Sequence, residues 1–259
     1  MKKFLCAAMA ATMVLGMAGC SSKKTDSAKV EENGKLIVGI TDFKPMDYRD
    51  ADGNWIGFDA ELAQAFAKSL GAEVEFVEIE WDNKVFELNA GTIDCVWNGM
   101  TLTDEVKSSM DCSNAYCKNA QIVVVKAEDA DKYSTVESLK DLTFAVESGS
   151  AGKTQAEKNG FKFTEVQSQA NAIMEVAAGT SDAAIVDLLM AGAMVGEGTS
   201  YEDLTYTIGL NSEEYGVGFR KGSDLVDKLN DYLKSAYSDG SLQALAQKYG
   251  VQASLIEQK

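Results

Sequence analysis

The chain has 259 residues, a formal net charge of −16 at pH 7, five cysteines and no histidine. Such an excess of acidic side chains argues against nucleic acid as a partner and against adsorption to anionic lipid by charge alone. The absence of histidine removes the most common general base and the usual catalytic triads, and no cysteine spacing typical of a metal site is present. We therefore expect no enzyme activity, no cofactor and no metal.

The N-terminus has the pattern of an export signal. Two lysines precede an apolar run over 4–18, which is too short for a permanent transmembrane helix and ends in small residues directly before Cys20. This pattern predicts a lipoprotein signal peptide over 1–19 and lipidation of Cys20, with an ordinary secretory signal as the alternative. The protein would then be held on the extracytoplasmic face of the cell membrane, and the polar stretch over 20–34 is interpreted as a flexible tether.

Three cysteines, Cys95, Cys112 and Cys117, lie beyond this segment, so they cannot all pair with one another. A disulfide between Cys112 and Cys117 is one interpretation in an oxidising compartment. Buried unpaired thiols are the other, and we favour it because free cysteine behaves as a small apolar side chain.

From residue 35 onward, short apolar runs alternate with amphipathic segments, which is typical of βα units. In chain order we expect a strand at 36–40, a hairpin turn at 52–54, a helix at 59–70, a strand at 74–79, a short helix at 85–90 and a strand at 93–97. A β-branched run at 121–125 is interpreted as the crossover into a second lobe. That lobe is expected to contain strands at 142–146, 163–166 and 183–186, and helices from 150, at 169–178 and at 188–195. The chain is then expected to return around 210–219 and to end in two helices with apolar faces at 225–233 and 242–249.

A series of short motifs runs through this region in a specific order and spacing. They include GFD at 57–59, GTID at 91–94, NGMTLT at 98–103, VESGS at 146–150, DAAIVD at 182–187 and EYGVGFRKG at 214–222. In these motifs the chain resembles the polar amino acid solute-binding proteins of ABC importers, over nearly the whole segment from 35 to 250.

The resemblance implies an α/β periplasmic-binding-protein-like fold with two lobes, a hinge and a ligand cleft between the lobes. Lobe 1 would cover 35–122 and 218–259, and lobe 2 would be inserted over 123–217. Ligand binding would close the lobes, and a monomer would deliver an amino acid or amine to an ABC permease and ATPase complex.

Nine residues are candidate ligand contacts: Asp42, Phe43, Trp81, Asn98, Gly99, Thr101, Glu147, Ser150 and Asp187. In the family that the chain resembles, aromatic rings at the positions of Phe43 and Trp81 enclose the ligand, and the carboxylate at Asp187 receives its ammonium. The alternatives are core packing for the two rings and a helix N-cap for the carboxylate.

The other candidates have simple chemical reasons. The stretch 98–101 follows a strand, where glycine lets the backbone approach a ligand and a hydroxyl can form hydrogen bonds, although a plain turn into a helix explains it equally. Ser150 stands at a helix start, whose free N–H groups favour a negative group, and a plain N-cap is the alternative.

Two departures from the family pattern concern the ligand. Val106 replaces the arginine that clamps the ligand carboxylate in relatives, and Lys153 or the helix start at Ser150 are possible substitutes. Glu147 adds an acidic group to Asp187, which favours a cation. The hypothesis is a positively charged ligand, either a basic amino acid or an amine without a carboxylate.

Two other functions compete with transport. Some proteins of this fold are exported dehydratases that act on prephenate-like acids, but a dianion suits a cleft without the arginine and with Glu147 poorly. An extracellular solute sensor is the second alternative. The sequence beyond the export signal has no apolar stretch of transmembrane length and no recognisable signalling domain, which favours transport.

Overall fold

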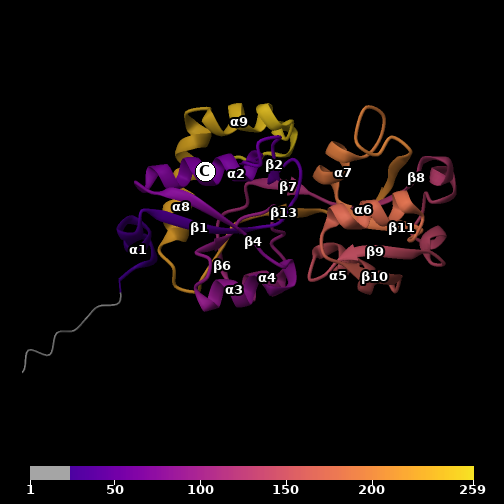
Figure 1. The fold of residues 1–259 in the computed structure, drawn as a ribbon, viewed down its shortest axis with the longest axis horizontal. Helices are drawn as coiled ribbons and strands as arrows, with labels where there is room; N and C mark the ends of the chain where they lie inside the picture. The colour runs from indigo at the N-terminus through magenta and orange to yellow at the C-terminus, as the bar shows by residue number, and fades with distance from the viewer. Residues whose placement is uncertain (1–23) are drawn as a thin grey trace, which may run out of the picture.

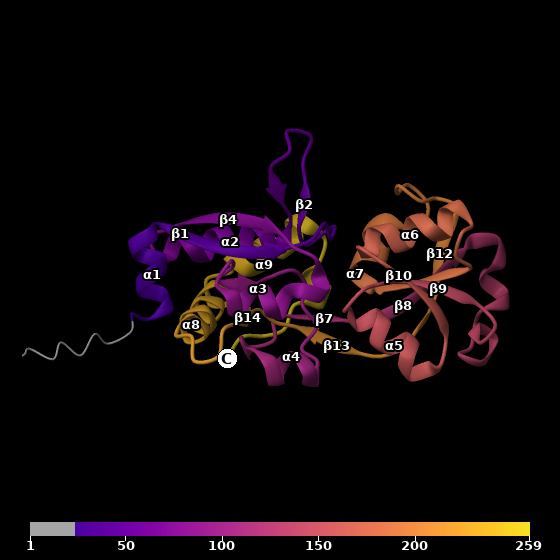
Figure 2. The same cartoon turned by 60° about the horizontal axis from the view of Figure 1, so that its bottom comes forward.

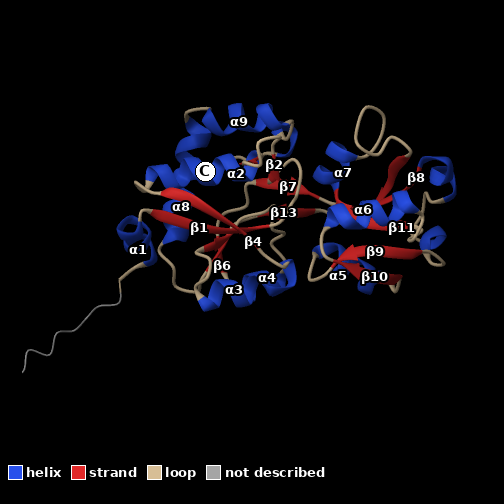
Figure 3. Ribbon diagram, in the orientation of Figure 1, coloured by secondary structure: helices blue, strands red, loops and turns tan. Residues whose placement is uncertain are grey.

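The computed structural model describes residues 24–259, which form two α/β lobes side by side (Figure 1). The signal peptide predicted over 1–19 and Cys20 lie outside the described residues. Each lobe contains a five-stranded sheet flanked by helices (Figure 3). The two-lobed fold predicted from the sequence is confirmed. In the region that is described, no helix has the length and apolar character needed to cross a membrane.

Lobe 1 contains the first and last parts of the chain around a sheet in the order β4-β1-β5-β14-β6. Its strands are β1 (Lys35–Ile40), β4 (Glu73–Glu78), β5 (Cys95–Val96), β6 (Asp111–Cys112) and β14 (Gly218–Phe219). Its helices are α1 (Asp26–Asn33), α2 (Phe58–Ser69), α3 (Lys84–Ala90), α4 (Asp104–Ser109), α8 (Leu225–Ser238) and α9 (Ser241–Tyr249). The hairpin of β2 (Tyr48–Arg49) and β3 (Trp55–Ile56) and the 3-10 helices η1 (Trp81–Asn83) and η4 (Gln252–Ser254) complete it. Because β1 pairs in parallel with β4 and β5, the carboxyl ends of these three strands meet at one edge.

Lobe 2 has a sheet in the order β10-β9-β11-β8-β12. Its strands are β8 (Gln121–Lys126), β9 (Thr143–Glu147), β10 (Lys162–Val166), β11 (Ala183–Asp187) and β12 (Leu204–Gly209). Its helices are α5 (Ala151–Asn159), α6 (Gln169–Ala178) and α7 (Leu188–Met194), with the 3-10 helices η2 (Ala127–Lys132) and η3 (Glu137–Leu139). Since β9 is parallel to β10 and β11, the last residues of β9 and β11 lie at the same edge of the sheet.

A two-stranded antiparallel ribbon of β7 (Cys117–Asn119) and β13 (Glu213–Tyr215) connects the lobes (Figure 2). The predicted crossover at 121–125 is therefore placed too late, because β8 is already a central strand of lobe 2. The chain leaves lobe 1 through β7 and returns through β13. The chain thus crosses twice, which is the arrangement needed for a hinge.

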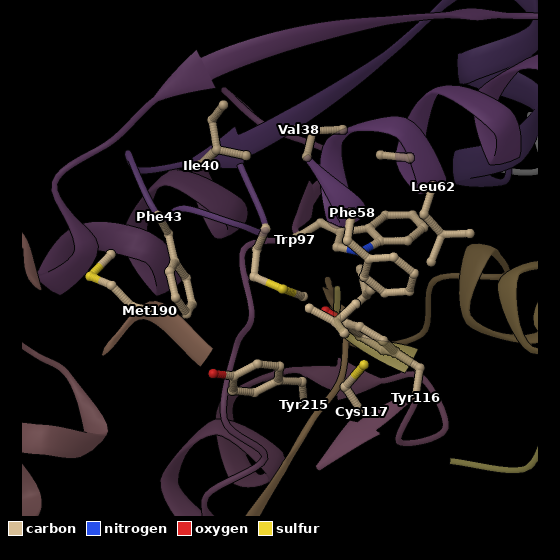
Figure 4. Packing of buried hydrophobic residues seen from close by; sticks show 14 of the residues in the cluster. Val38, Ile40, Phe43, Phe58, Leu62, Trp97, Tyr116, Cys117, Met190 and Tyr215 are labelled. Carbon is tan, nitrogen blue, oxygen red and sulfur yellow. The ribbon is translucent and has the colours of Figure 1, made fainter. Parts of the chain in front are cut away.

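Large aromatic side chains fill the core of lobe 1 beneath α2 (Figure 4). Phe58, Trp97 and Tyr116 are fully buried, and the ring centroids of Phe58 and Tyr116 lie 6.2 Å apart. The Tyr116 hydroxyl donates a hydrogen bond to Asp59 Oδ2 at 2.7 Å, which satisfies the polar end of this ring. The same cluster reaches the edge of the lobe, where Figure 4 shows Phe43 pointing toward Met190 of α7.

Helix α1 occupies most of the segment predicted to be a flexible tether, so that prediction is wrong over Asp26–Asn33. Thr25 caps the helix by accepting a hydrogen bond from Ala28 N. Ser27 N and Asp26 bind the rest of lobe 1, with Ser27 N donating to Asp224 Oδ1 at 3.0 Å and Asp26 forming an ion pair with Arg220 at 3.3 Å. The helix has no apolar periodicity that the sequence could show, because Val30 is its one large buried apolar residue.

The cysteines at 95, 112 and 117 are unpaired in the part of the chain that is described. Cys95 and Cys117 are buried and Cys112 is half-buried. Burial raises the pKa of the Cys95 thiol, so it behaves as a small apolar core side chain.

Candidate ligand-binding site

A cavity of about 240 Å³ lies between the lobes, at the carboxyl ends of their parallel strands. Residues after β1, β4 and β5 form one wall, and the ends of β9 and β11 with the start of α5 form the other. In open α/β sheets ligands bind at this edge, because the strands end there and the loops leave a crevice. The volume is slightly below the roughly 300 Å³ at which sites for drug-sized ligands begin, so it suits a small molecule.

Eight of the nine predicted contacts line this cavity: Phe43, Trp81, Asn98, Gly99, Thr101, Glu147, Ser150 and Asp187. Asp42 does not line it, and its side chain is exposed. Successive side chains in an extended segment point in opposite directions, so the buried neighbours Thr41 and Phe43 face inward and Asp42 faces outward. Thr41 is the residue of this loop that lines the cavity beside Phe43.

Two aromatic rings from lobe 1 border the cavity. Phe43 and Trp81 are 3% and 8% exposed, so both belong to the core and to the cavity wall. The Phe43 ring stands edge-on to Tyr215 of the hinge, with centroids 6.3 Å apart. Gly99 has a φ of +53°, and a Cβ at this position would collide with the Phe43 ring. The glycine therefore permits close packing of Phe43 against the loop after β5.

The side chain of Asn98 is fully engaged with lobe 1. Its Oδ1 accepts hydrogen bonds from Thr41 N at 2.8 Å and from the Thr41 hydroxyl at 2.6 Å. Its Nδ2 donates to Thr41 O and to Asp47 Oδ2. Asn98 therefore fixes the loops after β1 and β5 relative to each other and shapes the cavity wall.

Asp187, the last residue of β11, is buried at the base of the cavity. Asn119 Nδ2 donates to its Oδ1 at 3.0 Å, Gln169 Nε2 donates to its Oδ2 at 2.9 Å, and Gln121 Nε2 also donates to Oδ1. Its carboxylate forms no capping hydrogen bond to α7. Burial, and then the charge of Glu213, raise the pKa of Asp187 to about 7.

Glu147 ends the neighbouring strand β9 and is 3% exposed. Its Oε1 has no hydrogen-bond partner among the described residues. Burial and the nearby Asp187 raise the pKa of Glu147 to about 8, while Lys84 opposes the shift. Two nearby buried carboxyl groups disfavour each other's ionisation, and a cation in the cavity would stabilise the charged form of both.

Ser150 caps α5, and its hydroxyl accepts a hydrogen bond from Lys153 N at 3.1 Å. The start of this helix lines the cavity through Gly149, Ser150 and Ala151. The Lys153 ammonium lies 3.0 Å from Glu165 and is partly exposed. Lys153 already has a carboxylate partner, so it does not stand free as the substitute cation that the sequence suggested.

Lys84, the first residue of α3, lines the cavity and is 8% exposed, although the sequence reasoning did not select it. Its Nζ donates hydrogen bonds to Trp81 O at 3.1 Å and, across the cleft, to Gly149 O at 2.9 Å. A second bond between the lobes joins Gln167 Nε2 to Glu80 Oε1 at 2.6 Å. A lysine at a helix N-terminus opposes the helix dipole, and this is the sequence feature that could have revealed Lys84.

Acidic residues outnumber basic ones in the cavity wall. The acidic ones are Asp82, Glu105, Glu147, Glu157 and Asp187, and the basic ones are Lys84 and Lys153. Val106 also lines the cavity, so the residue that replaces the expected arginine does face this space. Such a balance favours a ligand that carries positive charge.

Comparisons with known proteins identify the family of the chain. Residues 36–252 match the model of the bacterial extracellular solute-binding proteins, family 3. The chain is 34% identical to the arginine-binding extracellular protein ArtP of Bacillus subtilis, covering 96% of this chain and 98% of ArtP. It is 30% identical to the L-cystine-binding protein TcyJ of Escherichia coli, covering 96% and 95%. Its structure resembles an ABC uptake transporter substrate-binding protein from Streptococcus pneumoniae with bound histidine, with a TM-score of 0.81, 30% identity, and coverage of 89% and 98%. The chain therefore belongs to the bacterial extracellular solute-binding proteins, family 3.

Proposed function

We propose that this protein captures an amino acid that carries positive charge, or a related amine, outside the cytoplasm and delivers it to the permease and ATPase of an ABC importer. The observation that carries this proposal is the pair of buried carboxyl groups, Glu147 and Asp187, at the lobe 2 wall of the cavity. Burial raises the pKa of both groups, and a cationic group nearby would stabilise their charged forms. The arginine and histidine named for relatives are compatible ligands.

Capture would proceed by closure of the lobes about the ribbon of β7 and β13. Lobe 1 contributes the aromatic wall of Phe43 and Trp81, and lobe 2 contributes Glu147 and Asp187. A ligand that contacts both walls favours the closed arrangement by its differential affinity for that state.

Anchoring is a separate part of the proposal. The sequence of the first twenty residues supports lipidation of Cys20, which would hold the protein at the outer face of the cell membrane. Replacing Cys20 with alanine is expected to shift the protein from the membrane fraction to the soluble fraction, as measured by fractionation. Unchanged membrane association of that variant would contradict the anchor.

An enzymatic role has less support than binding. ArtP and TcyJ are named as binding proteins, and the chain has no histidine to serve as a general base. An assay for phenylpyruvate formation tests the dehydratase alternative directly.

A thermal-shift screen tests the proposed function on the soluble form that begins at Ser21. The panel contains the proteinogenic amino acids, polyamines and quaternary amines at pH 7. A ligand that binds only the folded state raises the melting temperature by mass action. We expect stabilisation by basic amino acids or amines, and stabilisation by acidic amino acids alone would contradict the proposal.

Two variants refine the screen. Asp187→Asn is expected to weaken binding of the stabilising ligand by about 30-fold or more, because it removes one partner of a buried charge pair. Asp203→Asn, an exposed position on lobe 2, is the control and should bind as the wild type does. Equal affinities of the two variants would show that Asp187 does not receive the ligand.

A further inference from the structure

Lys84 is a buried cation at the point where the two lobes meet. It begins α3 in lobe 1, directly after η1, and its Nζ lies 4.8 Å from the centroid of the Trp81 ring. One hydrogen bond goes to its own lobe, at Trp81 O, and one to the opposite lobe, at Gly149 O. The ammonium is therefore fixed in the cavity wall and does not extend into solvent.

Among the described residues, no carboxylate lies within ion-pair distance of this ammonium. Lys84 forms no ion pair within residues 24–259, and both of its hydrogen bonds end on neutral carbonyl oxygens. A lysine ammonium carries three N–H donors, so one donor remains for another acceptor. Burial lowers the pKa of Lys84, although Glu147, Asp82 and Glu105 oppose this effect from a distance. A buried charge without a partner costs free energy that a bound anion would recover.

Lys84 provides a positive charge in a cavity where Val106 stands in place of the expected arginine. Val106 of α4 lines the same space and packs in the same apolar cluster as Trp81. The other lysine of the cavity wall, Lys153, is already bound to Glu165. Among the described lining residues, Lys84 is thus the cation that has no carboxylate partner.

We propose that Lys84 receives the carboxylate of the ligand, in place of the arginine that Val106 replaces, and so restricts the site to amino acids. This inference rests on the proposed function, because it assumes that the cavity between the lobes is the binding site. Lys84 and Glu147, whose Oε1 has no hydrogen-bond partner among the described residues, line the same cavity. The ammonium of Lys84 can bind an anionic group, and the carboxyl group of Glu147 can bind a cationic one. A zwitterion satisfies both, with its carboxylate on Lys84 and its ammonium on Glu147 or Asp187, whereas a simple amine leaves Lys84 without a partner.

Isothermal titration calorimetry with matched ligand pairs tests this assignment. The pairs are arginine with agmatine, lysine with cadaverine, and histidine with histamine, and the members of each pair differ by the α-carboxylate. The wild-type protein should bind the amino acid of a recognised pair at least about 30-fold more tightly than its amine. Lys84→Met should reduce that preference to within about threefold, because it removes the charge and keeps the unbranched stem.

Two further variants separate charge from folding. Lys84→Arg keeps the positive charge and should retain a preference for the amino acid. Lys107→Met changes an exposed lysine of α4 that does not line the cavity, and it should keep the full wild-type preference. Circular dichroism of each variant verifies that it is folded.

The possible outcomes distinguish this inference from the proposed function. If folded Lys84→Met keeps the full preference, the carboxylate is bound elsewhere and Lys84 serves only the contact between the lobes. If the wild type binds an amine as tightly as its amino acid, the inference fails while capture of a cation stands. If no member of any pair binds, the proposed function itself fails.

Discussion

Glu147→Gln removes a buried titrating group from the cleft and keeps its size. The folded protein raises the pKa of Glu147 from an ordinary value of 4.5 to about 8. Between these pH values the folded protein holds a proton that the unfolded chain releases, so the free energy of unfolding falls as the pH rises through this window. Each pH unit within it corresponds to about 1.4 kcal/mol. From pH 6 to pH 8, Glu147 alone should therefore reduce the stability of the ligand-free protein by about 2 to 3 kcal/mol.

Urea unfolding of the ligand-free protein at pH 6, 7 and 8 measures this effect. Glu147→Gln should lose less stability than the wild type over that range, with a residual decrease from Asp187, whose pKa is about 7. Glu157→Gln is the control, because Glu157 borders the same cavity but is exposed, and its stability should follow the wild-type dependence on pH. Equal losses of stability in Glu147→Gln and the wild type between pH 6 and pH 8 would show that Glu147 does not titrate in this range.

Three other predictions address binding and the N-terminal helix. A cation favours the charged form of the two cleft carboxyl groups, so the affinity for a cationic ligand should rise from pH 6 to pH 8.5, and binding should release protons. Calorimetry in buffers of different ionisation enthalpy measures both effects. An affinity that does not change with pH would contradict this prediction. Gly149→Ala should weaken ligand binding at least tenfold, about 1.4 kcal/mol, because its Cβ would lie 2.7 Å from the Cα of Asp82 across the cleft. Gly160→Ala has a similar φ, +69° against +67°, but meets no described atom within 4 Å, so an equal loss of affinity in both variants would rule out a clash between the lobes. Thr25→Ala should lower the free energy of unfolding by about 1 kcal/mol in urea, and an unchanged value would mean that the cap contributes nothing.

The fold was largely predictable because its strands and helices have strong local patterns. Helix α6 has the bounds predicted from its apolar spacing, Gln169–Ala178, and the β-branched run of β8 is a central strand. The hinge strand β7 was not predicted, because three residues are too few to show periodicity. Its pairing also depends on β13, which lies almost one hundred residues later in the chain.

The site was predictable where a polar residue ends a buried strand, as Glu147 and Asp187 do. Lys84 was missed, because only its place at a helix start marks it in the sequence, and its hydrogen bond to Gly149 joins residues 65 positions apart. The prediction that Asp42 contacts the ligand was wrong for a local reason, because every second side chain of an extended segment points outward. The chemical character of the site could be inferred from residue types, but the directions of its side chains and their hydrogen-bond partners required the three-dimensional structure.

The docked helix α1 limits how far a membrane-anchored protein could move from its membrane. A tether over 20–34 would reach about 50 Å when extended, whereas the link from Cys20 to Thr25 reaches about 18 Å. With the anchor at Cys20, lobe 1 would stay close to the bilayer and would search a small volume around the permease. A shorter link raises the effective concentration of the binding protein at its partner, so α1 would increase the frequency of productive encounters without any additional contact.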